Sequence, residues 1–335
     1  MKHANIALFI PHNGCRHQCS FCNQRAITGK SYQPSPRDVD DAITRALATY
    51  KGGSKNMELA FFGGSFTAIG RDYMESLLES AQPYLKNGTL RGIRISTRPD
   101  CIDEQILSLL KSYGVTSIEL GAQSMCDAVL KANGRGHTAH DVIAASRMIR
   151  ERGFSLGLQM MTGLYKSTPQ RDFETAEQIA ALSPDTVRIY PTVTMKGTAL
   201  ETLYLDGRYT PPTLEDTVAL CSSLLIYFEA RGIPVIRLGL HDSESLKEDR
   251  IAGPYHPALR ELCESRILLL DIKKQIKEKK LQRGALALRI NPRAASKACG
   301  QKKSNLAELS KLGYHAEIVR DESVPVGAVI AEERQ

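Results

Sequence analysis

Three of the eight cysteines of this chain lie in the stretch Cys15-Arg-His-Gln-Cys19-Ser-Phe-Cys22. The apolar run Ile6–Ile10 comes shortly before them and predicts a strand, so the thiols sit on the loop that follows it. The other five cysteines stand alone and lack the spacing of a disulfide framework. We expect those five to be small, buried, apolar side chains.

The C-x3-C-x2-C spacing of the three thiols favours an iron–sulfur cubane. Three thiolates can hold one face of such a cluster and leave the fourth iron open to a small molecule. Zinc is the main alternative, with His12 or His17 as a fourth ligand. Structural zinc sites usually pair their ligands at two-residue spacing, however, and no second C-x-x-C pair follows. A thioredoxin-like use of Cys19 and Cys22 is less favoured, because such motifs lack a third cysteine just upstream.

Beyond the cysteines, short β-like runs alternate with segments of helical periodicity. The predicted strands are 6–10, 59–62, 92–96, 117–120, 155–160 and 186–189, and the predicted helices are 38–50, 73–85, 103–113, 139–153 and 168–182. Six strand–helix units predict an α/β fold with parallel strands and right-handed crossovers. They can form a partial barrel or an open doubly wound sheet, and in both cases ligands bind at the carboxyl ends of the strands.

The pattern changes after Tyr190. Residues 191–212 and 241–257 are predicted to be loops, separated by a helix over 214–231 and a possible strand over 235–238. A further helix begins near Ala258. From Asp271 on we predict a small α+β module with a helix, a strand over 285–290, a helix over 305–312 and strands over 315–319 and 327–330. The predicted domains are therefore 1–270 and 271–335.

The charge of the chain is concentrated at its end. Residues 271–335 carry 14 Lys and Arg against 8 Asp and Glu, and residues 273–303 carry 11 basic side chains against the single acid Glu278. This excess predicts a polyanionic partner, although a solvated basic helix would also explain it. No apolar stretch approaches the roughly 20 residues that span a bilayer, and the start of the chain lacks the pattern of a signal peptide. We expect a cytoplasmic protein without a membrane partner.

Several polar or glycine-rich stretches follow predicted strands. Gly63-Gly64-Ser65 follows the second strand, where two glycines allow close approach of a ligand or simply a tight turn. Ser96 ends the third strand, and Glu119 and Gln123 lie at the end of the fourth. Arg135 follows soon after, and it could also be a loop arginine that caps the next helix. These positions meet at the edge where a barrel binds its ligands.

The cysteine motif, with Phe21 before its last cysteine, resembles the signature of the radical S-adenosylmethionine (SAM) superfamily. The resemblance implies a partial (β/α)6 barrel in which Cys15, Cys19 and Cys22 bind a [4Fe-4S] cluster whose open iron chelates SAM. It also implies reductive cleavage of SAM to a 5′-deoxyadenosyl radical, with an electron donor such as flavodoxin or ferredoxin. The cofactor-binding residues that it implies are Phe21, Gly63, Gly64, Ser65, Ser96, Glu119, Gln123 and Arg135.

Blocks further along resemble one branch, the radical SAM domain of the catalytic subunit of Elongator and its relatives. They include Thr97-Arg-Pro-Asp100, Arg135-Gly-His-Thr138, Ile189-Tyr-Pro-Thr192 and Lys196-Gly-Thr198. The resemblance places Lys196, Tyr190 and Tyr209 on the substrate side, as candidate catalytic residues. Two positions depart from the family pattern: Ser96 replaces a glutamate, and Thr162-Gly163 replaces a proline–aspartate pair. The 65 or so residues after Asp271 are too few for the acetyltransferase domain of the Elongator subunit, so we expect none.

Three functions remain in competition. The first is a radical SAM enzyme that modifies tRNA or rRNA and binds RNA through basic residues 273–303. The second is a radical SAM enzyme that acts on a porphyrin-like small molecule or on a protein. The third is a non-catalytic iron–sulfur or zinc protein that binds RNA, in which Ser96 and Gly163 reflect lost SAM binding.

Overall fold

The computed structural model describes residues 4–11, 13, 15, 18–23, 32–49 and 57–334. The chain forms two compact units. The larger comprises residues 1–212 and 228–254, and the smaller comprises 213–227 and 255–335. The domain boundary predicted after residue 270 falls inside helix α12 (Leu259–Glu278), so the smaller unit also takes in 213–227 and 255–270.

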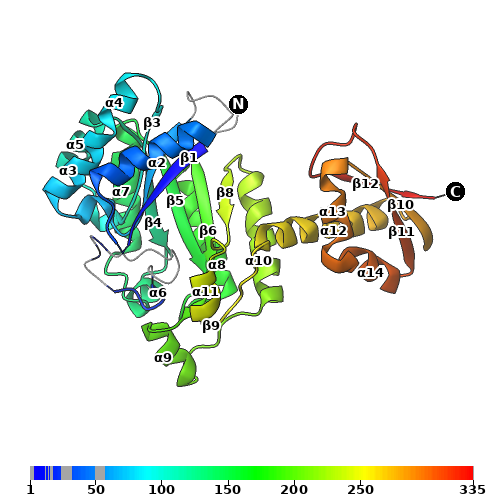
Figure 1. Ribbon diagram of the computed structural model, residues 1–335. Coiled ribbons are helices and arrows are strands. Elements are labelled where there is room, and N and C mark those ends of the chain that lie inside the picture. The colour runs from blue at the N-terminus through cyan, green and yellow to red at the C-terminus, as the bar shows by residue number, and fades with distance from the viewer. Residues whose placement is uncertain are drawn as a thin grey trace. The chain divides into compact units, whose positions relative to one another are not determined.

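The larger unit is built on one parallel sheet. Its strands are β1 (Ala4–Ile10), β2 (Met57–Gly63), β3 (Gly92–Thr97), β4 (Val115–Gln123), β5 (Ser155–Thr162), β6 (Thr186–Pro191) and β8 (Val235–Leu238). The strands follow one another in chain order from β1 to β8. A doubly wound sheet reverses its order at a switch point, and this sheet does not. The sheet curls into a partial barrel (Figure 1), which confirms the predicted fold and adds β8 as a seventh strand.

Helices cover the outer face of this sheet (Figure 1). They are α2 (Pro36–Thr49), α3 (Arg71–Ser80), α4 (Gln82–Lys86), α5 (Glu104–Ser112), α7 (Ala139–Glu151) and α8 (Pro169–Ala181). The chain also forms 3-10 turns at Phe66–Ala68 and Pro99–Cys101 and the short helix α6 (Asp127–Ala132), whose Val129 packs with Met161 and Leu164. The single helix predicted over 73–85 is in fact α3 and α4. Pro83 has no N–H to continue the hydrogen-bond ladder of α3, so the helix breaks just before it.

The segments predicted as loops contain short elements. These are β7 (Thr194–Met195), α9 (Ala199–Leu205), α11 (Glu244–Asp249) and β9 (Arg250–Ala252). Strands β7 and β9 pair antiparallel and so join the two segments. The loop prediction was wrong here because elements of two to seven residues are too short to show periodicity.

The smaller unit holds the predicted α+β module. It contains most of α10 (Leu214–Glu229), then α12, β10 (Gly284–Ile290), α13 (Ala295–Cys299), α14 (Ser304–Lys311), β11 (Tyr314–Arg320) and β12 (Val329–Glu333), with 3-10 turns at Pro292–Ala294 and Gln301–Lys303. Strand β10 lies between β11, which is parallel to it, and β12, which is antiparallel. Its side chains Leu286, Leu288 and Ile290 are fully buried with Ile272 of α12. Within the described residues, no helix has the length and apolarity needed to cross a bilayer.

Candidate active site

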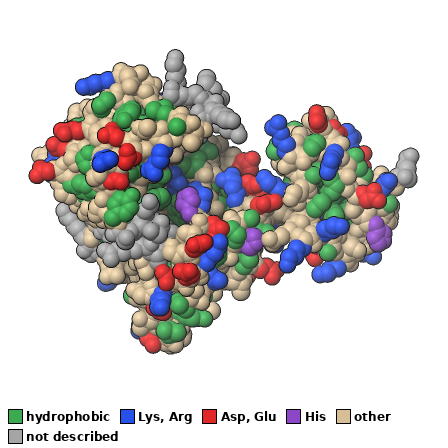
Figure 2. All heavy atoms as spheres, in the orientation of Figure 1, with side chains coloured by type: hydrophobic (Ala, Val, Ile, Leu, Met, Phe, Trp, Pro, Cys, Tyr) green, Lys and Arg blue, Asp and Glu red, His purple; other side chains and the backbone are tan. Residues whose placement is uncertain are grey.

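The inner face of the partial barrel lines a cavity of about 780 Å³. Successive side chains of a strand point to opposite faces, so alternate residues share a face. Ser96 of β3, Glu119 and Gln123 of β4 and Tyr190 of β6 line the cavity in this way. Figure 2 shows a hollow in the larger unit in which basic and histidine side chains lie together. This volume lies in the upper part of the range of small-molecule sites, about 300–1,000 Å³.

The cysteine loop forms one wall of the cavity. Cys15, Cys19, Cys22 and Phe21 all line it. Ser20, inside this loop, is bound to the loop before α7: its N–H donates to Asn133 O at 3.0 Å, and its hydroxyl donates to Asn133 Oδ1 at 2.7 Å. Ser20 O also accepts from the N–H of Leu200 at 2.8 Å. Two distant segments therefore fix this part of the loop.

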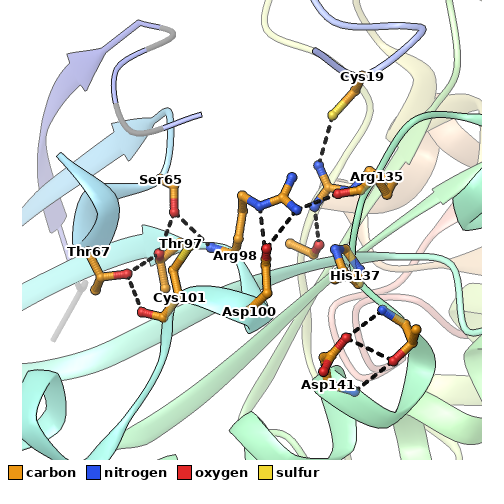
Figure 3. Close-up of polar contacts among 12 residues, drawn as sticks. Cys19, Ser65, Thr67, Thr97, Arg98, Asp100, Cys101, Arg135, His137 and Asp141 are labelled. Carbon is orange, nitrogen blue, oxygen red and sulfur yellow. Dashed lines mark hydrogen bonds and ion pairs between the residues drawn. The ribbon is translucent and has the colours of Figure 1, made fainter. Parts of the chain in front are cut away.

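The thiols lie beside two arginines, as Figure 3 shows for Cys19. Arg135 Nη1 donates to Cys19 Sγ at 3.2 Å. Burial raises the pKa of Cys15, and the neighbouring Cys19 raises it further, while Arg135 and Arg98 act in the opposite direction. Among the described residues, no three His, Cys, Asp or Glu side chains are grouped closely enough to hold a metal ion. The three thiols thus share a cavity wall without converging on one point.

Two glycines at the end of β2 allow its backbone to approach the start of the cysteine loop closely. Gly64 donates its N–H to Ile10 O at 2.8 Å, and a Cβ at Gly64 would lie 2.0 Å from Asn13 O. Gly63 has a φ of +115°, and a Cβ there would lie 2.7 Å from Ile10 O. Both glycines line the cavity. The close approach of two backbones therefore explains why both positions are glycine. Their contact with SAM stays a prediction.

Ser65 lies beneath the glycines and does not line the cavity. It is fully buried, and its Oγ is 2.8 Å from Thr97 Oγ1. Thr97 Oγ1 is also 2.6 Å from Thr67 Oγ1, whose hydroxyl donates to Cys101 O (Figure 3). The hydroxyls join the ends of β2 and β3. A contact between Ser65 and SAM stays a prediction.

Gln123 and Arg135 meet at the end of β4. Gln123 has a φ of +65°, next to an irregularity in the pairing with β5, and its Oε1 accepts from Gln159 Nε2 at 3.3 Å. Arg135 Nη2 donates to Gly121 O at 2.6 Å. The Nε of Arg135 is buried, and it has no hydrogen-bond partner in the described part of the chain. Both residues line the cavity, and Arg135 retains a donor for an anionic group.

Two further residues, Arg98 and His137, lie beside Arg135. Arg98 forms a two-pronged ion pair with Asp100, at 2.9 and 3.0 Å, and also donates to the backbone oxygen of Arg135. His137 is buried with Nε2 3.2 Å from Ala122 O. Burial lowers the pKa of His137 to about 4, and the positive charge of Arg135 is the second largest cause. The ring is therefore neutral at pH 7 and donates a hydrogen bond to that carbonyl.

Glu119 lies in a buried ion network. It accepts from Arg94 Nη1 at 3.2 Å and from Arg188 Nη2 at 2.9 Å, and Arg94 also pairs with Glu58 at 2.9 Å. Glu119 lines the cavity, but both arginines occupy its carboxylate. Buried charges need such partners. The predicted contact between Glu119 and SAM is untested.

Of the three candidate catalytic residues, Tyr190 alone lines the cavity. It packs with Phe21 against one apolar cluster, and burial raises its pKa. Lys196 is exposed, and its backbone O accepts from Asn23 Nδ2 at 3.0 Å. Tyr209 is buried and donates to Gly163 O at 2.7 Å. Gly163 has a φ of +71° and donates to Asp172 Oδ2, so Thr162-Gly163 forms a braced turn.

Several residues that line the cavity were missed in the sequence. They are Arg94, Arg98, Gln159, Arg188, Arg237 and His241. The strand period of two could have found some of them, because Arg94 lies two residues before Ser96 and Arg188 lies two before Tyr190. Arg237 had no such signal, since its strand was only a possible one.

Comparison with known proteins identifies the family. Residues 9–179 match the radical SAM superfamily, and residues 184–268 match the radical SAM C-terminal domain. The chain therefore belongs to the radical SAM superfamily, whose members use a [4Fe-4S] cluster and SAM. The chemistry of the donor set fits these groups: three thiols line one cavity together with the positively charged side chain of Arg135.

Curated relatives support the Elongator-like branch. The chain is 26% identical to a tRNA uridine(34) acetyltransferase of Dehalococcoides mccartyi, over 75% of this chain and 62% of that protein. It is 28% identical to human Elongator complex protein 3, over 64% of this chain and 42% of that protein. The chain thus spans less than two thirds of either relative.

Solved structures agree on the fold. Elp3 of the archaeon Methanocaldococcus infernus, with an N-terminal deletion, has a TM-score of 0.61 and 21% identity, covering 84% of this chain and 65% of that one. Coproporphyrinogen III oxidase of Escherichia coli has a TM-score of 0.50 and 20% identity, covering 69% and 53%. At these identities the likeness concerns the fold alone.

Proposed function

We propose that this radical SAM enzyme modifies a nucleotide of tRNA or rRNA inside the barrel. The single observation that carries the proposal is the arrangement of the cavity. The cysteine loop, Gly63, Gln123 and Arg135 line one part of it, while Tyr190 and Arg188 line the part formed by β6. One cavity thus has room for SAM beside a second group. The kinship with a tRNA uridine(34) acetyltransferase supports RNA as the source of that group.

The chain's own residues have distinct tasks in this proposal. When bound, the cluster and SAM supply a 5′-deoxyadenosyl radical that abstracts hydrogen from the substrate. Cys15, Cys19 and Cys22 would hold the cluster, and the positive charge of Arg135 would attract the carboxylate of SAM. Tyr190 lies on the substrate side, where its buried ring excludes water.

The smaller unit supplies a surface for the RNA backbone. Within residues 273–303, four basic residues are already paired: Lys273 with Glu308, Lys274 with Glu278, Lys297 with Glu264, and Arg289 with Asp321 and Glu332. Seven others in that segment are exposed and form no ion pair within the described residues, and one of them, Lys279, donates instead to Gln275 Oε1 and Ala331 O. The remaining six are Lys277, Lys280, Arg283, Arg293, Lys302 and Lys303. We infer that these six, rather than the whole basic segment, contact phosphates.

Mass spectrometry of nucleosides tests the reaction. Digests of tRNA and rRNA from cells with and without the gene should differ in one modified nucleoside. The purified protein, reconstituted anaerobically, should release 5′-deoxyadenosine from SAM with dithionite. Identical digests would exclude RNA and leave a small molecule or a protein as the substrate. A protein that binds zinc and never cleaves SAM would be the non-catalytic alternative.

Salt-dependent binding tests the surface. The triple variant Lys277→Glu, Lys280→Glu, Arg283→Glu should weaken binding of total tRNA and flatten its dependence on salt. The control variant Arg45→Glu, Lys86→Glu, Arg91→Glu makes the same charge change on the larger unit and should leave binding nearly unchanged. Equal effects of the two variants would show that only the net charge matters.

A further inference from the structure

Two arginines lie side by side at the far edge of the sheet from the cysteine loop. Arg188 of β6 and Arg237 of β8 are register partners, and both line the cavity. The cysteine loop follows β1, at the opposite end of the strand order. Like charges directly opposite each other on neighbouring strands destabilise a sheet. A fold that keeps this pair needs compensating negative charge.

Only one of the two arginines is compensated within the fold. Arg188 donates to Glu119 at 2.9 Å, and its guanidinium lies 5.0 Å from the ring centre of Phe62. Among the described residues, Arg237 donates only through its Nε, to Gly239 O at 3.0 Å, and no carboxylate pairs with it. Asp242 also lines the cavity, but it pairs with Lys247 at 2.8 Å.

The turn after β8 orients Arg237. Gly239 has a φ of +87°, and its N–H donates to Ile189 O at 3.0 Å. This turn places the Gly239 carbonyl at the Nε of Arg237. With Nε engaged, the two terminal nitrogens of the guanidinium remain as a fork that matches an oxyanion.

A third basic group borders the same place. His241 lines the cavity two residues beyond Gly239. Burial lowers its pKa, and the charges of Arg237 and then Arg188 lower it further. The two arginines therefore disfavour the protonated form of His241. An anion among the three side chains would offset the charge of both arginines and favour protonation of the ring.

We propose that Arg188, Arg237 and His241 form an oxyanion site, which binds a phosphate of the RNA strand beside the nucleotide to be modified. This inference rests on the proposed function for the source of the phosphate. Arg135 lies beside Cys19, near the end of β4, and is the residue proposed to pair with SAM. Arg188 and Arg237 therefore give the cavity a second cationic position, which suits a second ligand. A guanidinium fork with two free nitrogens binds phosphate oxygens in pairs.

Equilibrium dialysis tests the site with small probes. The probes are the four ribonucleoside 5′-monophosphates and their parent nucleosides, with inorganic phosphate and acetate as competitors, on the full chain reconstituted with its cluster and SAM. The monophosphates should bind at least about tenfold more tightly than the nucleosides, as charged hydrogen bonds do. Arg237→Gln should remove this advantage, whereas Arg91→Gln, an exposed arginine outside the cavity, should keep it.

The opposite results overturn the proposal. Equal binding of nucleosides and monophosphates, or an advantage that persists in Arg237→Gln, would show that no phosphate binds there. Competition by acetate as strong as that by phosphate would assign the site to a small carboxylate instead. Arg237→Gln should keep the parent's iron content and a cooperative unfolding transition in urea, which separates a lost anion site from a misfolded barrel.

The dialysis is independent of the proposed function. Identical nucleoside digests with and without the gene would exclude RNA as the substrate, and the monophosphate advantage would then still report on the anion site. Equal binding of monophosphates and nucleosides by the parent chain, together with a changed digest, would exclude this site and leave RNA modification standing.

Discussion

The guanidinium of Arg135 lies 3.2 Å from the sulfur of Cys19, while its second terminal nitrogen holds Gly121 O at 2.6 Å. One side chain thus connects the cysteine loop to the end of β4. Its Nε has no partner in the described part of the chain. The link couples the thiols to the position where SAM is expected.

Replacement of Arg135 should weaken SAM binding more than cluster loading. Arg135→Gln removes the charge and the free donor, and we expect SAM affinity to fall at least about tenfold. Equilibrium dialysis with labelled SAM measures this on anaerobically reconstituted protein. Arg152→Gln, which changes an exposed arginine at the C-terminal end of α7, is the control. Unchanged affinity would place the SAM carboxylate elsewhere.

A methyl group at Gly64 should displace the cysteine loop. Gly64→Ala puts a Cβ 2.0 Å from Asn13 O, and such overpacking costs about 1–3 kcal/mol. We expect fewer irons per chain after reconstitution and a lower free energy of unfolding in urea. Gly70→Ala is the matched control, because nothing lies within 4 Å of its Cβ. Full iron loading of Gly64→Ala would contradict the close approach seen here.

Removal of the Glu119 charge should destabilise the barrel. Glu119→Gln leaves Arg94 and Arg188 short of a buried negative charge, at a cost of about 3 kcal/mol or more. Urea unfolding measures this loss. SAM affinity of the fraction that folds then separates two roles: a retained affinity would mark Glu119 as structural, and a lost one would support its predicted contact with SAM.

Asp172 should make the larger unit less stable as the pH rises. Burial raises its pKa from 3.8 to about 6, although Ser167 and Gly163 donate hydrogen bonds to it. Between about pH 4 and pH 6 the folded chain keeps a proton that the unfolded chain has released, so the free energy of unfolding falls across that window. The full effect is about 2–3 kcal/mol.

The Asp172→Asn variant should lose this pH dependence and be more stable than the parent above pH 6. Urea unfolding at pH 4.5 and 7.5 measures the difference. Asp141→Asn is the opposite control, because the backbone hydrogen bond from Thr138 lowers the pKa of Asp141. Loss of the Asp141 charge should lower the free energy of unfolding at neutral pH. The difference in that free energy between Asp141→Asn and the parent should shrink as the pH falls. If the free energies of unfolding of the parent and Asp172→Asn differ by the same amount at both pH values, the pKa of Asp172 is not raised.

The sequence by itself determined the local features of this protein. The period of two in 92–96 and 117–120 and the helical period between them predict parallel strands. The C-x3-C-x2-C spacing predicts Cys15, Cys19 and Cys22 as cluster ligands, because ligand spacing on one loop is a property of adjacent residues. The breaks in the pattern, as at Pro83, can also be explained from single residues.

The tertiary structure alone decided which distant residues meet. Strand order excluded the doubly wound sheet that periodicity had left open. The sequence predicts that Glu119 contacts the cofactor, but only the curled sheet shows that its carboxylate lies between Arg94 and Arg188. The pairing of Arg188 with Arg237 spans two strands whose register depends on an irregularity after Val187. Such contacts depend on how strands pack side by side, which no local spacing records.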